Sequence, residues 1–82
     1  MINILFFARL REVVGQRNVQ HQLSHDKTPT VNTVFEEIKD QFKQLGDEKN
    51  ISAALNQELL SDWNIQVQDG DEIAFFPPIT VG

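Results

Sequence analysis

A chain of 82 residues, 40% of them hydrophobic, is long enough for one small domain whose single core buries roughly 60% of the unfolded surface. The net charge of −5 disfavours nucleic-acid binding, which requires clustered lysine and arginine, and suits a basic protein partner. The absence of cysteine excludes disulfides, thiolate metal ligands and cysteine nucleophiles. No stretch reaches the roughly 20 apolar residues of a membrane span. Residues 1–5 lack the basic leader of a signal peptide, so we expect a cytoplasmic protein.

The first predicted element is a strand over residues 2–8, which is apolar on both faces from Ile4 onward. This pattern is typical of a central strand covered on two sides. A short helix follows, because apolar residues recur at i, i+3 and i+4 between residues 10 and 14, and Gly15 suits the position after its end. Residues 18–23 alternate polar and apolar, as in a half-exposed strand. The connection is too short for a parallel crossover, so the two strands should pair antiparallel.

The longest periodic segment predicts an amphipathic helix between Thr30 and Gly46. Thr30 can cap its start, and Gly46 can end it with Lys43 in the last turn, where a cation suits the helix dipole. The positions that define its apolar face are Val31, Val34, Phe35, Ile38, Phe42 and Leu45.

The second half of the chain predicts a hairpin followed by irregular structure. We expect a strand over residues 51–55, a tight turn over residues 56–58 and a brief return strand over residues 59–60. Residues 61–68 should be irregular. The large apolar side chains expected to cover one end of the core there are Trp63, Ile65 and Val67.

A turn at residues 69–71 introduces the last predicted strand, over residues 72–76, which is apolar on both faces and should lie centrally beside the first. Pro77 and Pro78 end it, because proline cannot donate to a sheet ladder. We therefore expect a domain over residues 1–76 and an extended tail over residues 77–82, which can span roughly 18 Å at about 3 Å per residue. The tail ends in a glycine carboxylate.

Together these elements predict an α+β domain in which a mixed sheet of four to five strands packs on one long helix, with one short helix besides. Candidate catalytic groups are scattered. His21 and His25 lack further ligands at metal-binding spacing, the glycines are isolated, and no serine sits in a nucleophile elbow. We expect no metal site, so chemistry should be borrowed from a partner or reside on the terminal carboxylate.

Several stretches resemble the small subunit of molybdopterin synthase, within the ubiquitin-like sulfur-carrier family. The resemblance covers essentially the whole chain, and its ending is the most specific part. The matching stretches are residues 4–8, 10–15, 29–31, 53–57 and 69–80.

This resemblance implies a β-grasp fold and a subunit with no active site of its own. The carboxylate of Gly82 would be adenylated by an ATP-dependent activating enzyme and converted to a thiocarboxylate. The tail would then enter the large, catalytic subunit, where the sulfur passes to a cyclic pyranopterin monophosphate during molybdenum cofactor biosynthesis. Family assemblies are heterotetramers. No cofactor is expected to be bound, since ATP is used by the activating enzyme, and neither nucleic acid nor membrane is an expected partner.

The resemblance also implies roles for particular residues. Those expected to contact partner proteins are Phe7, Arg11, Leu59 and Phe76, and those expected to carry Gly82 into the partner are Pro77, Pro78, Ile79, Thr80 and Val81. The family pattern ends in two glycines, whereas this chain ends Val81-Gly82, and a channel shaped for two glycines would clash with the valine side chain. Two alternatives stay open: a β-grasp interaction module whose tail is never activated, and a sulfur carrier for another pathway, such as thiamine or tungsten-cofactor synthesis.

Overall fold

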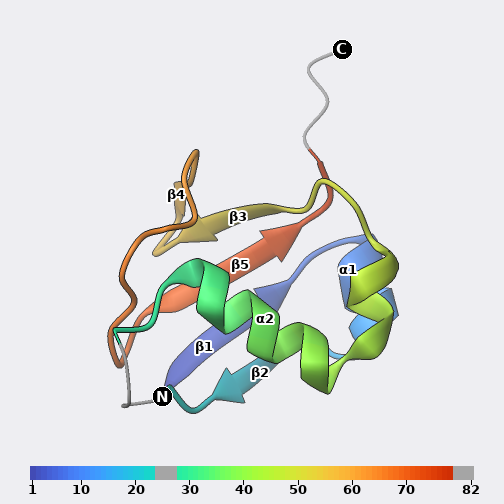
Figure 1. Ribbon diagram of the computed structural model, residues 1–82. Helices are drawn as coiled ribbons and strands as arrows, with labels where there is room; N and C mark the ends of the chain where they lie inside the picture. Colours follow the sequence, from blue (N-terminus) through green and yellow to red (C-terminus); the bar gives the residue numbers. More distant parts are fainter. Residues whose placement is uncertain (24–27, 79–82) are drawn as a thin grey trace.

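Five strands form one mixed sheet in the order β2-β1-β5-β3-β4 in the computed structural model, which describes residues 1–23 and 28–78 (Figure 1). The strands are β1 (Ile2–Phe6), β2 (Asn18–His21), β3 (Ser52–Leu55), β4 (Glu58–Leu59) and β5 (Glu72–Phe76). β1 and β5 pair in parallel at the centre, and the other neighbouring strands pair antiparallel. The predicted antiparallel pairing of the first two strands and the central position of the last strand are confirmed.

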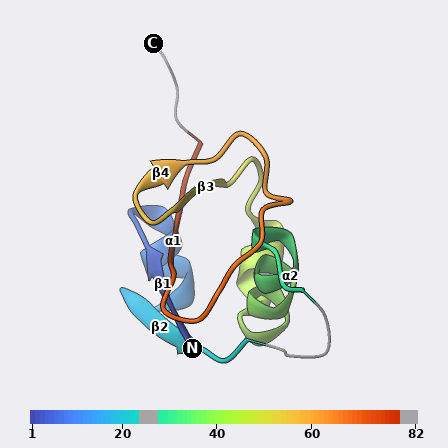
Figure 2. The same ribbon diagram turned by 90° about the vertical axis from the view of Figure 1, so that its left-hand side faces the viewer.

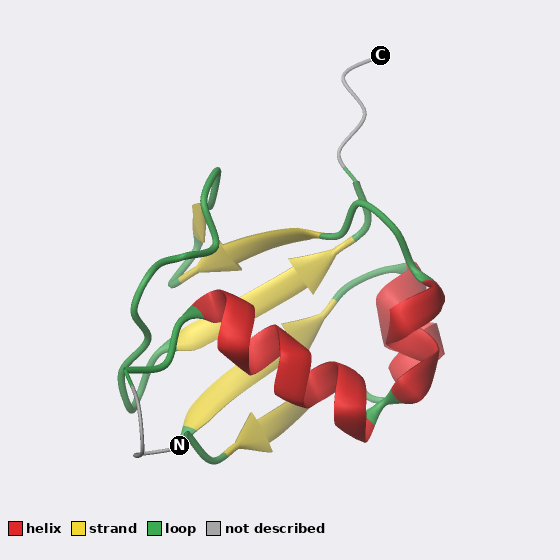
Figure 3. Ribbon diagram, in the orientation of Figure 1, coloured by secondary structure: helices red, strands yellow, loops and turns green. Residues whose placement is uncertain are grey.

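Helical segments accompany the sheet in the described part of the chain (Figure 3). They are α1 (Arg9–Val14), α2 (Val31–Gln41) and the 3-10 helix η1 (Lys43–Asp47). α2 crosses one face of the sheet, whereas α1 and η1 contact each other at the end where β1 finishes (Figure 1). α1 ends as predicted, since Gly15 has a φ of +84°, a left-handed conformation that glycine adopts without steric cost.

The start of α2 follows the sequence prediction, but its end does not. Thr30 and Thr33 form a reciprocal capping box, in which the Thr33 amide donates to Thr30 Oγ1 at 3.3 Å and the Thr30 amide donates to Thr33 Oγ1 at 2.8 Å. The helix was predicted to continue to Gly46, which is wrong, because Phe42 leaves the helical conformation at φ −120° and ψ 85°. The tighter turn of η1 then directs Leu45 into the core, where it is 1% exposed.

The hairpin between β3 and β4 uses a two-residue turn. Asn56 and Gln57 have φ values of +49° and +71°, the pattern of a type I′ turn, whose twist matches that of the flanking strands. The predicted three-residue turn is therefore one residue too long, and Glu58 belongs to β4 rather than to the turn.

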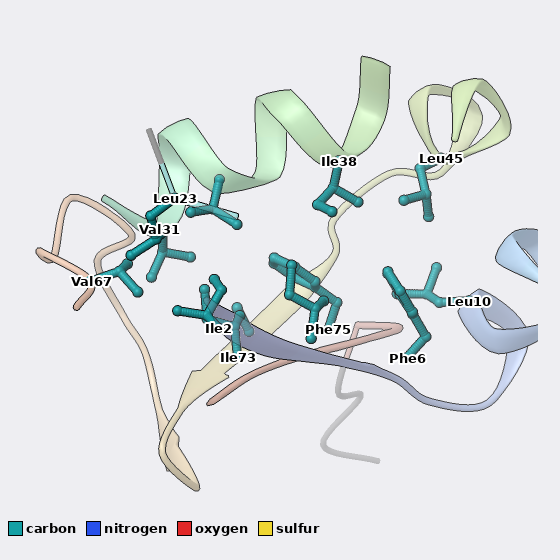
Figure 4. Packing of buried hydrophobic residues seen from close by; sticks show 13 residues of the cluster. Ile2, Phe6, Leu10, Leu23, Val31, Ile38, Leu45, Val67, Ile73 and Phe75 are labelled. Atoms are coloured by element: carbon teal, nitrogen blue, oxygen red, sulfur yellow. The ribbon is translucent and has the colours of Figure 1, made fainter. Parts of the chain in front are cut away.

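The core lies between α2 and the face of the sheet turned towards it (Figure 4). The main contributors from the two central strands are Ile2, Ile4, Phe6, Ile73 and Phe75, and those from α2 are Val31, Val34 and Ile38. As expected, Trp63 and Val67 cover one end, with the Trp63 ring 5.6 Å from that of Phe75, whereas Ile65 stays 37% exposed.

The prediction that the first strand is covered on two faces is wrong. Burial alternates along β1 and β5, so the residues that point away from α2, such as Leu5 and Phe76, are only partly buried. In the side view, α2 lies on one side of the sheet, and no described helix crosses the other side (Figure 2). We call this second side the open face.

Candidate functional site

The tail leaves the sheet at the end of a central strand. β5 ends at Phe76, Pro77 is half-buried and Pro78 is exposed. The predicted tail residues Ile79, Thr80 and Val81 and the predicted reactive residue Gly82 lie outside the described residues. The surroundings of Pro77 and Pro78 therefore define the root of the tail.

An apolar row crosses the open face from one edge of the sheet almost to the other. Strand register aligns its members in the order Leu59, Ala54, Ala74 and Leu5, followed by the polar Asn18 on β2. These residues share a face because side chains alternate along a strand, and their neighbours Ile4 and Ile73 point into the core. Leu59 ends the row with 59% of its surface exposed.

Two phenylalanines extend this apolar row towards the root of the tail. Phe76 lies two residues beyond Ala74 and opposite Ser52. Phe7 lies two residues beyond Leu5, is 47% exposed, and its amide donates to the Phe75 carbonyl at 3.1 Å, which continues the parallel ladder past β1. Alternation therefore places both aromatic rings on the open face, beside the point where the tail begins.

The opposite end of the open face is polar. Asn3 lies between Gln20 and Glu72 in the register, and the Gln20 side-chain Nε2 donates to Asn3 Oδ1 at 3.1 Å. The Glu72 amide donates to Asn56 Oδ1 at 2.9 Å. The open face thus changes from polar to apolar along the direction of β5, and its apolar part adjoins the tail.

The structure brings three of the four predicted contact residues onto this face. Phe7, Leu59 and Phe76 share it, whereas Arg11 is exposed on α1 beyond the end of β1. Sequence reasoning missed Leu5, Ala54 and Ala74, which join Leu59 to the phenylalanines. Only strand register reveals that connection, because these small or partly buried residues look like core residues in the sequence.

A strained turn fixes the end of β1. Ala8 has φ 53° and ψ −128°, and the Leu10 amide donates to the Phe7 carbonyl at 3.1 Å. These values belong to the first central position of a type II′ turn, which glycine normally occupies. The turn sets the direction of α1 and the position of Phe7, and no sequence signal marks Ala8 for this conformation.

Polar groups elsewhere serve the fold. His21 Nε2 lies 2.7 Å from Glu37 Oε1, which joins β2 to α2. Within residues 1–23 and 28–78, no three histidine, aspartate or glutamate side chains converge as a metal site would require. No helix in the same ranges is long and apolar enough to cross a membrane.

Comparison with known proteins gives the family. The ThiS family matches residues 4–82. The chain belongs to the ThiS family. Among its relatives, the molybdopterin synthase sulfur carrier subunit of Escherichia coli is 36% identical over 85 residues, with 100% of both chains covered. The predicted family is thereby confirmed.

Solved structures agree with this assignment. SAMP1 from Haloferax volcanii superimposes with a TM-score of 0.82 at 26% identity, covering 99% of this chain and 98% of that one. A chain in the complex of subunits 1 and 2 of the molybdopterin-converting factor of Helicobacter pylori has the same fold, with a TM-score of 0.68 at 21% identity, covering 99% of this chain and 97% of that one. The predicted β-grasp fold is confirmed.

Proposed function

We propose that this member of the ThiS family is the sulfur carrier subunit of a molybdopterin synthase. The full-length similarity to the Escherichia coli carrier supports the assignment. The observation that carries it is the arrangement of the open face, where an apolar surface adjoins the root of a tail that ends in glycine. A carrier needs both features, because it must dock on a partner while its terminus reaches the partner's reaction centre.

The chemistry of the proposal resides on Gly82. Its carboxylate is ionised at neutral pH, so it can attack the α-phosphate of ATP held by an activating enzyme, but it is itself a poor electrophile. Adenylation with release of pyrophosphate converts the carboxylate into an acyl adenylate. Sulfur then displaces AMP to form a thiocarboxylate, which divides one difficult substitution into two easier steps. The carrier supplies no catalytic side chain and binds no cofactor of its own.

The proposed partner in sulfur transfer is the large subunit, which receives the tail and passes the sulfur to a cyclic pyranopterin monophosphate. The solved complex of the two subunits from Helicobacter pylori supports such a partner. We place Phe7, Leu59 and Phe76 in the docking surface, with Arg11 as a polar contact beside it. Pro77 and Pro78 restrict the backbone at the root of the tail, which lowers the ordering entropy lost when the tail inserts. We place the assembly, a heterotetramer of two small and two large subunits, in the cytoplasm.

Val81 favours a second candidate, an interaction module with an unactivated tail, since the family pattern has glycine at this position. One experiment separates the two. The chain is incubated with the activating enzyme, ATP and a sulfur donor, and its intact mass is measured. We expect the mass change of one oxygen replaced by one sulfur, located in the C-terminal peptide. An unchanged mass, beside a related carrier that the same enzyme does convert, would refute the carrier function and favour the module.

Two variants sharpen this experiment. Deletion of Gly82 should leave the unfolding midpoint unchanged and abolish sulfur transfer, because the activated carboxylate is then carried by valine. Val81→Gly tests whether the valine limits entry into the partner, and we expect it to convert at least as fast as the natural chain. Equal transfer by the truncated chain would contradict the role of Gly82.

A further inference from the structure

A pocket lies beside the β3–β4 hairpin, away from the root of the tail. It has a volume of about 230 Å³ and is open to solvent. Its walls are Leu55, Glu58, Leu59, Leu60, Ser61, Asp62 and Ile65. The segment that follows β4 curves away from the sheet in Figure 2 and supplies the last four of these residues.

The walls of the pocket combine apolar and acidic side chains. Leu55, Leu60 and Ile65 provide apolar surface, whereas Glu58 and Asp62 provide two carboxylates. Within residues 1–23 and 28–78, the ion pairs involve neither of these two acids. Asp62 Oδ1 accepts a hydrogen bond from the Asn64 amide at 2.9 Å, which holds this carboxylate in place at the pocket.

We propose that this pocket receives a long cationic side chain, arginine or lysine, from the large subunit. Covering the pocket with an apolar partner surface would desolvate two unpaired carboxylates, which is costly. A long cationic side chain avoids this cost, because its methylene groups can pack on the leucines while its charged end pairs with the carboxylates. The net charge of −5 suits the same partner.

The position of the pocket connects it with the docking surface. Leu59 lines the pocket and also ends the apolar row of the open face. The pairing of Leu55 with Ile73 and Glu58 places these two pocket walls on the α2 side of the sheet, so a large subunit that covers the row reaches the pocket by extending around the β4 edge. This inference rests on the proposed function. It adds Glu58 and Asp62 to the residues that contact the partner. Because this charge pair lies far from the tail, it provides a second point of contact, which fixes the orientation of the partner on the sheet.

The test compares two double variants with the same change in net charge. Glu58→Gln with Asp62→Asn neutralises the pocket, and the asparagine can still accept the Asn64 amide. Glu36→Gln with Asp40→Asn neutralises two exposed acids on α2 that do not line the pocket. Affinity for the purified large subunit is measured by calorimetric titration at low and high salt, using the unmodified carboxylate form of each chain.

We expect the pocket variant to bind at least about tenfold more weakly at low salt, with a smaller salt dependence, and the α2 variant to change by less than about twofold. Sulfur transfer at saturating large subunit should equal that of the natural chain, because the tail is intact. Equal affinities of the two double variants for the large subunit would overturn the inference. Failure of the natural chain to acquire sulfur would instead count against the proposed function, since the binding measurement does not require the thiocarboxylate.

Discussion

The two faces of the sheet are built from the same strands, yet they differ in burial. Side chains that alternate along β1 and β5 enter the core on one face, where α2 and Trp63 enclose them. On the open face, Leu59 and Phe7 remain 59% and 47% exposed. Apolar surface on the first face therefore stabilises the fold, whereas apolar surface on the second remains open to a partner.

Two adjacent phenylalanines on opposite faces test most directly whether the two faces differ in their contribution to stability. Phe75 is fully buried, with the Phe35 ring at 5.0 Å, so Phe75→Ala should lower the free energy of unfolding by about 3–5 kcal/mol. Phe76→Ala removes a partly exposed ring and should cost about 1–2 kcal/mol. Urea unfolding monitored by Trp63 fluorescence measures both. Equal losses would mean that the faces do not differ energetically.

Substitution of Leu59 tests directly whether the open face binds the large subunit. Leu59→Ala should change the free energy of unfolding by no more than about 0.5 kcal/mol, because the side chain is largely exposed. It should weaken binding to the large subunit about tenfold, or about 1.4 kcal/mol, since a leucine buried at an interface is lost. Gln41→Ala, at the exposed end of α2, is the matched control and should leave the affinity unchanged. A stable variant with full affinity would exclude Leu59 from the interface.

On the covered side, the capping box of α2 gives a smaller effect. Thr30→Ala removes the acceptor of the Thr33 amide and should lower the free energy of unfolding by about 1 kcal/mol. Thr30→Ser keeps the hydroxyl oxygen and should retain most of the stability. Thermal unfolding of the three chains side by side gives the answer, and partner affinity at a temperature where all are folded should not change.

The smallest expected effect is a gain in stability. Ala8→Gly relieves a backbone conformation that costs an alanine about 1–2 kcal/mol, against an entropic cost of about 0.5–1 kcal/mol for glycine. The net increase in unfolding free energy should be about 0.5–1 kcal/mol, because Ala8 is exposed and its methyl group contributes little packing. A loss of stability, measured by urea unfolding, would show that the methyl group is needed at the turn.

Local signals explain which parts of the fold could be predicted from the sequence. Thr30 marks the start of α2 and Gly15 marks the end of α1. Helix capping by Thr30 and helix termination by Gly15 each depend only on residues within one helical turn, so both can be read from the sequence. The end of α2 could not be located, since Phe42 and Leu45 continue the apolar periodicity while their packing requires the change to η1. Tertiary contacts decide that boundary.

The exposure of the open face could not be predicted from the sequence for a different reason. A strand covered on both faces and a strand whose second face serves an interface have the same apolar sequence pattern. The proposed roles of Phe7, Leu59 and Phe76 came from the family resemblance. That these residues share one face could be seen only from the register of β1, β5, β3 and β4. The pocket beside the hairpin gave no sequence signal, because its walls join residues from β3, β4 and the irregular segment that follows.

The parallel pairing of β1 with β5 has a consequence for biosynthesis. The middle of the sheet pairs the strand at residues 2–6 with the strand at residues 72–76, so a ribosome-bound chain cannot complete the sheet before residue 76 has emerged. A product that stops short of β5 lacks its central partner and exposes its apolar residues to chaperones and proteases. Native folding therefore requires the strand that leads directly into the tail, and a chain without β5 cannot form the open face.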